Sequence, residues 1–147
     1  MKAYLTWGVG YGKSRELAEA NAQADANLDK IKINKLKKLE IPRCKIIEDK
    51  KQLTKLKGNF FGIVLQNCQK GEVAAALVLG ITADKIVIGH GKAGGAIKAE
   101  RIANIEMRKV IEKQELKFEG INYHIVADAP AKKDIYSCAI VALVLEE

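Results

Sequence analysis

The stretch that decides the fold is AYLTWGVGYGKSRELAEANAQADANL, residues 3–28. Residues 3–7 have the composition of a strand, and glycines at positions 8, 10 and 12 follow before Ser14, a residue type that favours helix N-caps. A helix is predicted next, with one stripe of small or apolar side chains suited to close packing on a sheet: Leu17, Ala20, Ala24 and Leu28. The chain therefore opens with a strand, a glycine turn and a helix.

The rest of the chain alternates apolar runs with glycine or polar boundaries. Strands are predicted at residues 31–34, 44–47, 60–65, 74–81, 85–88, 121–126 and 136–145. A basic connection is expected at residues 35–42, a short helix at 49–57 ended by Gly58, and a loop at 89–95. A long helix follows that loop, with one apolar face: Ile102, Ile105, Val110 and Ile111. This order predicts one α+β domain over residues 1–147, a helix-covered sheet with parallel and antiparallel neighbours.

Length and composition narrow the class of protein. A chain of 147 residues is long enough to bury one core without disulfides or metals. No apolar run reaches the roughly 20 residues of a membrane span, and the opening MKAYLTWGVG lacks a signal peptide's features. We therefore expect a cytoplasmic protein with no membrane partner.

The three cysteines suggest neither a metal site nor a disulfide framework. Cys44, Cys68 and Cys138 are far apart and form no C-x-x-C pair, and the chain has only two histidines. We expect buried thiols that pack as small hydrophobic side chains, and no metal.

The net charge of +7 raises the alternative of an anion- or nucleic-acid-binding protein, through the lysine-rich residues 30–51. Only four arginines supply the forked guanidinium that suits phosphate and base recognition. Lysine- and glutamate-rich surfaces are also typical of thermophilic proteins, so a solvated lysine face is the preferred explanation.

Three local motifs resemble known sites without matching them. GVGYGKS, residues 8–14, misses the P-loop spacing because Trp7 stands where the first glycine is needed. A dinucleotide fingerprint fails because its third glycine falls one position early. GHGKAGG, residues 89–95, places His90 and Lys92 among glycines, as a binding loop would, but a tight strand connection that needs positive backbone angles is the preferred explanation. No Ser-His-Asp or Cys-His set can be assembled.

Four segments, in order, resemble the pyruvoyl-dependent arginine decarboxylases over most of the chain. They are LTWGVGYGKSRELAEANAQADANL at 5–28, GEVAAALVLGI at 71–81, GGAIKAE at 94–100 and SCAIVALVL at 137–145. The resemblance implies a four-layer α/β/β/α sandwich with two largely antiparallel, mixed sheets. It also implies a trimer with ligand pockets between subunits, and a pyruvoyl group made by self-cleavage at a serine, which captures the substrate amine before carbon dioxide departs.

The resemblance breaks at the catalytic positions. Asn34 and Lys35, in IKINKLKKLEIP, stand where the family has its Ser-Ser cleavage pair, and neither can become a pyruvoyl group. Lys98 stands where the family has an acidic residue; Glu100, two positions on, would share its face if this segment were a strand. The ligand-binding positions implied are Asp29, Asn34, Lys35 and Glu100.

These observations favour a decarboxylase-like protein that is not processed and acts as a ligand-binding or partner subunit. No cofactor is expected; a pyruvoyl group would require an unconventional processing site. The partners expected are two further copies of the chain or a catalytic paralogue, with a small cationic or amino-acid ligand. An active decarboxylase that converts arginine to agmatine is the enzyme alternative.

Overall fold

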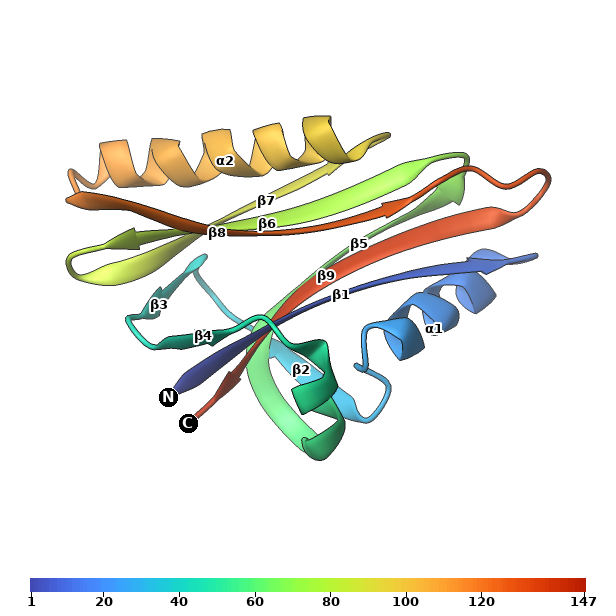
Figure 1. Cartoon of the computed structure of the whole chain (residues 1–147), viewed down its shortest axis with the longest axis horizontal. Helices are drawn as coiled ribbons and strands as arrows, with labels where there is room; N and C mark the ends of the chain where they lie inside the picture. The colour runs from blue at the N-terminus through green and yellow to red at the C-terminus, as the bar shows by residue number, and fades with distance from the viewer.

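The computed structural model describes residues 1–147, apart from the side chains of Ile121 and Asn122. Two sheets pack face to face, and one helix covers the outer face of each sheet (Figure 1). The four layers in order are α1 (Arg15–Asp25), a five-stranded sheet, a four-stranded sheet and α2 (Ala96–Lys113). The expected α/β/β/α sandwich of α+β type is confirmed.

The five-stranded sheet is organised around the last strand of the chain. Its order is β2 (Ile31–Lys35), β5 (Gly58–Lys70), β9 (Tyr136–Glu146), β1 (Lys2–Gly12) and β4 (Lys45–Ile47). The two outer pairs, β2–β5 and β1–β4, are parallel, and β9 runs antiparallel to both of its neighbours. The prediction that the continuously apolar SCAIVALVL is central is confirmed, because both faces of β9 are covered.

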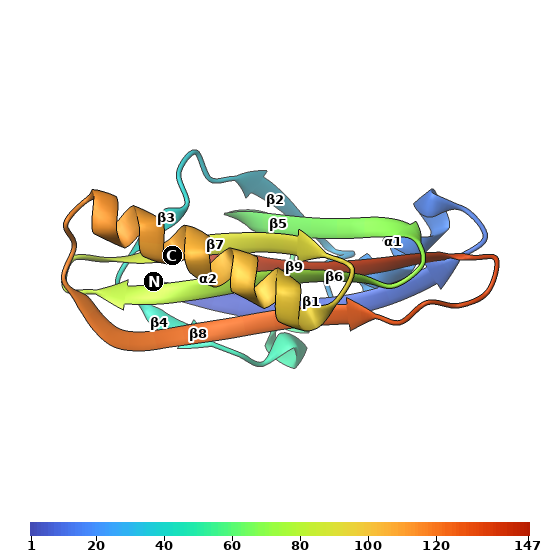
Figure 2. The ribbon, with the colours of Figure 1, turned by 90° about the horizontal axis from the view of Figure 1, so that it is seen from above.

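The four-stranded sheet has the order β3 (Glu40–Pro42), β7 (Lys85–Ala93), β6 (Val73–Thr82) and β8 (Phe118–Ala129). All its pairs are antiparallel. Every residue of β6 is buried, because α2 covers one face and the five-stranded sheet covers the other. Seen from above, α2 runs over the middle of this sheet (Figure 2).

The helix α1 begins as predicted, but buries a different face. The Ser14 hydroxyl accepts a hydrogen bond from the backbone N–H of Leu17, as an N-cap does. Ala18 and Ala22 are buried, whereas Leu17, placed on the expected apolar stripe, is 49% exposed. The glycines of β1 explain the difference: a Cβ at Gly10 would collide with the backbone of Ala22, so the helix axis lies too close for leucine.

The predicted buried face of α2 is also wrong, and again glycines under the helix are the cause. Ala99, Ala103, Met107 and Ile111 are buried, whereas Ile102 and Ile105 are 38% and 47% exposed. Residues 89–93 are not a loop but the end of β7, and Gly89 and Gly91 lie directly under the helix. A Cβ at Gly91 would meet the backbone of Ala99. Positive backbone angles are found instead at three other glycines, Gly58, Gly71 and Gly120.

Other boundaries differ in smaller ways. The connection at 35–42 contains the short strand β3, and the helix expected at 49–57 is the 3-10 helix η1 (Lys50–Lys55). Gly58 does not end that helix but begins β5. Within the part of the chain that the structure describes, no helix is both long and apolar enough to cross a membrane.

Candidate functional site

The first predicted site segment lies on an edge strand. Asn34 and Lys35 are the last two residues of β2 and pair with Phe61 and Gly62 of β5. Both side chains are exposed. Asp29 lies in the turn before β2 and lines a small hollow of about 210 Å³ against Leu53 and Leu56. All three residues therefore lie within residues 29–35, at the β2 edge of the five-stranded sheet.

The second predicted segment lies on the opposite helix layer. Lys98 and Glu100 are in the first turns of α2, so the strand that would let them share a face is not present and the two side chains point in different directions. Glu100 Oε2 lies 2.9 Å from Nδ1 of His124, on β8. Since α2 covers the outer face of the four-stranded sheet, this segment and β2 belong to different layers of the chain (Figure 1).

The two serines have structural positions. Ser14 caps α1. Ser137 is fully buried in the central strand β9, and its hydroxyl has no hydrogen-bond partner among the described side chains and backbone groups. Neither lies at the Asn34–Lys35 position of β2.

A hollow at the start of α2 combines carboxyl groups with lysine and arginine. Its volume is about 670 Å³, and it is lined by residues that include Glu72, Asp128, Lys98 and Arg101. A hydrogen bond and repulsion between the two carboxyl groups raise the pKa of Glu72. The exposed Ile97 also borders this hollow, so its wall is partly apolar.

A second large hollow, which the sequence did not predict, lies beside the unpaired half of β5. Its volume is about 600 Å³, and its lining comes from α1, β5, β7 and β9: Arg15, Glu19, Gln66, Asn67, Cys68, Gln69, Lys70, Lys92 and Tyr136. Arg15 and Lys70 both lie over the ring of Tyr136, at 5.8 and 5.4 Å from its centroid. Nothing in the sequence places Arg15, Lys70 and Lys92 together, because they come from three separate elements.

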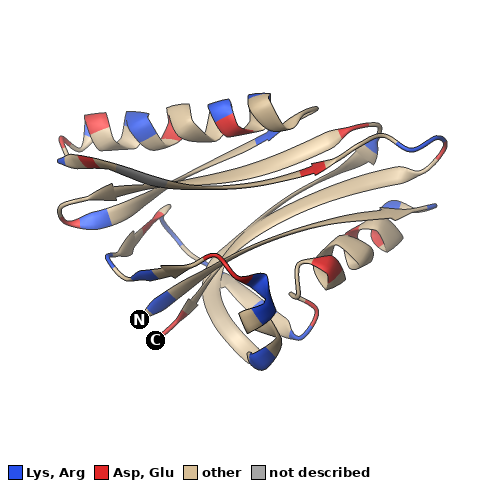
Figure 3. Cartoon of the chain, viewed as in Figure 1, with Lys and Arg blue, Asp and Glu red and all other residues tan. Residues whose placement is uncertain are grey.

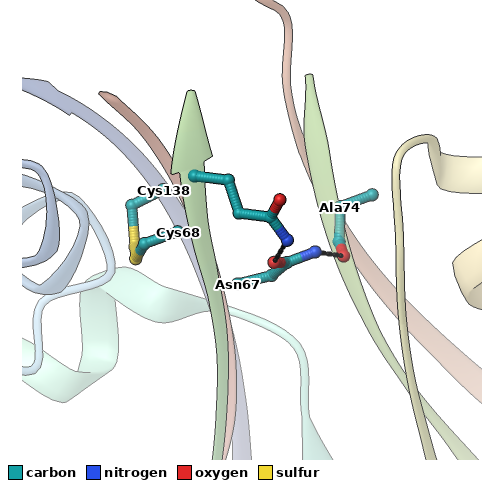
Figure 4. The surroundings of a disulfide bond; sticks show 5 residues. Asn67, Cys68, Ala74 and Cys138 are labelled. Carbon is teal, nitrogen blue, oxygen red and sulfur yellow. Dashed lines mark hydrogen bonds between the residues drawn. A yellow bond between two sulfur atoms is a disulfide. The ribbon is translucent and has the colours of Figure 1, made fainter. Parts of the chain in front are cut away.

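One residue that lines the hollow, Cys68, takes part in a disulfide. Cys68 of β5 and Cys138 of β9 are directly opposite each other and are joined, with Cα atoms 4.1 Å apart (Figure 4). The expectation of three thiols is therefore wrong for this pair; Cys44 is the free cysteine. The sequence does not indicate the pair, because 70 residues separate the two cysteines and only strand pairing aligns them.

Beside the disulfide, one amide side chain connects the two sheets and a second amide on the same strand bonds to it. The Asn67 amide donates to the carbonyl oxygens of Ala74 and Ala93, at 3.2 and 3.1 Å. Gln69 Nε2 in turn donates to Asn67 Oδ1 at 3.3 Å. Figure 4 shows Asn67 reaching from β5 toward Ala74. The amide N–H donors of Asn67 and Gln69 are thus used within the fold.

The lysine-rich residues 30–51 do not form a uniform basic surface. Lys50 Nζ donates to the carbonyl oxygens of Trp7 and Asp25, and Glu40 pairs with Lys85 at 3.1 Å. Acidic and basic residues alternate over the molecule (Figure 3). Among the described residues, no group of three or more histidine, cysteine or acidic side chains is arranged to hold a metal ion.

No protein-family model matches the chain, and no curated protein is similar to it. The resemblance to the arginine decarboxylases therefore stays a prediction from four sequence segments.

Proposed function

We propose that this chain is an unprocessed, decarboxylase-like protein that serves as a ligand-binding or partner subunit and does not run the pyruvoyl reaction. The observation that carries the proposal is the Asn34–Lys35 position. Both residues lie in a paired strand and carry no side-chain hydroxyl. Pyruvoyl formation needs the amide to migrate to such a hydroxyl, so this position cannot supply the cofactor.

The two remaining serines support the same proposal. Cleavage at Ser14 would remove the cap of α1, and cleavage at Ser137 would cut β9, the central strand of the five-stranded sheet. Either cut would disrupt a layer of the sandwich.

The proposal includes an assembly. Asn34–Lys35 and Lys98–Glu100 occupy different layers, so a pocket that uses both segments would have to form between chains, with a paralogue or with two further copies. Sedimentation equilibrium tests the homotrimer: a mass of three chains is expected, and a purely monomeric protein at high concentration would contradict the homotrimer and leave the paralogue as the partner to test. A cytoplasmic location is the corresponding proposal for the compartment, and cell fractionation tests it.

Intact mass spectrometry of the purified protein tests the lack of processing. One chain of 16.1 kDa is expected. Two fragments, one of which carries a reactive terminal carbonyl, would overturn the proposal. Incubation with arginine is the second measurement: no agmatine is expected, and its formation would show an active decarboxylase instead.

A double variant, Asn34→Ser with Lys35→Ser, is the matched control for both measurements. It restores the hydroxyls at an exposed edge strand, where their addition leaves the packing unchanged. Self-cleavage of this variant beside an intact wild-type chain would show that the missing hydroxyl is what prevents processing.

A further inference from the structure

The unpaired half of β5 creates an opening in the side of the sandwich. β2 pairs with β5 no further than Gly62, whereas β5 continues to Lys70. The backbone N–H of Leu36 donates to the carbonyl of Gly62 at 3.0 Å, so Gly62 points its polar groups away from β9. Along a strand, every second residue directs its backbone N–H and C=O groups to the same side. The backbone N–H groups of Gln66, Cys68 and Lys70 therefore face the hollow of about 600 Å³.

Positive charge gathers around this opening. Arg15, Lys70 and Lys92 line it, against the single acidic side chain Glu19 among its described lining residues. None of these three cations takes part in an ion pair with another described residue. Cation–π contacts hold Arg15 and Lys70 over the same Tyr136 ring. Two like charges are thus held close together, and neither forms an ion pair with a described carboxylate.

The rigidity of the walls matters for binding. The disulfide ties β5 to β9 through Cys68, which lines the hollow, and the Asn67 amide ties β5 to both β6 and β7. Because these contacts fix the strand that carries Lys70 and the backbone donors, little ordering of the main chain would accompany binding.

We propose that this hollow binds a small organic anion, a carboxylate or a phosphate ester. Arg15 supplies a planar guanidinium suited to either group, Lys70 and Lys92 supply point charges, and the outward N–H groups of β5 supply neutral donors. This inference deepens the ligand-binding role proposed above, since it names the ligand chemistry and the site.

Isothermal titration at low ionic strength tests the site, with citrate, inorganic phosphate and glucose 6-phosphate as separate probes. At least one probe is expected to bind with one site per chain. Citrate alone would identify the carboxylate as the ligand group, and the phosphate probes alone would identify the phosphate. No binding by any of the three would overturn the proposal.

Variants locate the binding. Arg15→Gln and Lys70→Gln are each expected to weaken it about tenfold or more, because each removes a charged hydrogen bond. Lys109→Gln, on the exposed side of α2, removes the same charge and should leave binding unchanged. Equal weakening by all three variants would show a diffuse charge effect and contradict a built site. Tight binding of a single-stranded oligonucleotide, weakened alike by Lys109→Gln, would identify a nucleic-acid surface instead.

Backbone amide chemical shifts give a readout independent of affinity. Changes are expected at Gln66, Cys68 and Lys70, and their absence during saturation would overturn the placement. Whether the chain is cleaved does not depend on anion binding, so intact mass tests the unprocessed-subunit proposal and titration tests the anion site, and failure of one is distinguishable from failure of the other.

Discussion

The two helix layers are built in the same way from unrelated sequence. α1 lays Ala18 and Ala22 on the glycines of β1, and α2 lays Ala99 and Ala103 on Gly89 and Gly91 of β7. In both, larger apolar side chains of the helix remain exposed. The comparison shows that here helix position is set by how closely two backbones approach, and that hydrophobic side-chain size is secondary. The layers differ in their attachments: α1 has a hydroxyl cap and a disulfide beneath it, and α2 has neither.

Removal of the disulfide should give the largest loss of stability, and the loss should be greater in the α1 layer than in the α2 layer. Replacing both Cys68 and Cys138 by alanine is expected to lower the free energy of unfolding by about 4 kcal/mol, through loss of a long loop closure. Urea unfolding measures this, and amide exchange should rise more in α1 than in α2. Cys44→Ala is the control. A count of three reactive thiols in the unfolded wild-type chain, where one is expected, would contradict the bond.

Substitution of the glycines under each helix should give the second-largest loss of unfolding free energy. Gly10→Ala and Gly91→Ala each place a Cβ against helix backbone, so a loss of about 3 kcal/mol in unfolding free energy is expected for both. Gly94→Ala, whose added Cβ meets a nearest atom at 3.8 Å, should change stability by less than about 0.5 kcal/mol. If Gly10→Ala destabilised the protein and Gly91→Ala did not, only α1 would be held by close backbone contact. Urea midpoints at constant slope provide the measurement.

Substitutions at the N-caps of the two helices should change the unfolding free energy by smaller amounts than the glycine substitutions do. Ser14→Ala removes the hydrogen bond to Leu17 and is expected to cost about 1 kcal/mol. Gly95, the N-cap of α2, has an extended backbone and open space for a side chain, so Gly95→Ser should stabilise by a few tenths of a kcal/mol. Thermal unfolding of both variants measures the asymmetry, and destabilisation by Gly95→Ser would contradict it.

The smallest effect concerns Glu72 and Asp128, near the start of α2. The raised pKa of Glu72 means that the folded state binds its proton more tightly than the unfolded state does, so stability falls as pH rises through the titration of this carboxyl. Glu72→Gln should reduce that fall. Melting temperatures between acidic and neutral pH test it, with Glu16→Gln as a matched exposed control; an unchanged slope in Glu72→Gln would show that the carboxyl pair does not affect folding.

Much of the element order follows from the sequence, because strands such as SCAIVALVL and the Ser14 cap have strong local signals. The four-layer arrangement was expected only from the family resemblance. The buried faces of the two helices could not be predicted in the same way. Leucine and isoleucine are normally expected to be buried before alanine, and the glycines that favour alanine here lie on strands, outside the helices. Glu100 could share a face with Lys98 only in a strand, and the structure has residues 98–100 in α2, where the predicted long helix begins. The cationic hollow and the disulfide arise from strand register over long separations, which local patterns do not encode.

The central place of β9 affects the order in which the chain can fold. During synthesis β1 and β5 emerge early, yet each lacks its longest neighbour in the five-stranded sheet until the final residues appear. The pair β6 and β7, by contrast, is adjacent in sequence and can form with α2 beforehand. Contacts between distant parts of a chain slow folding. The four-stranded side therefore has the opportunity to assemble first, and the five-stranded side must wait for the last strand to join its two halves.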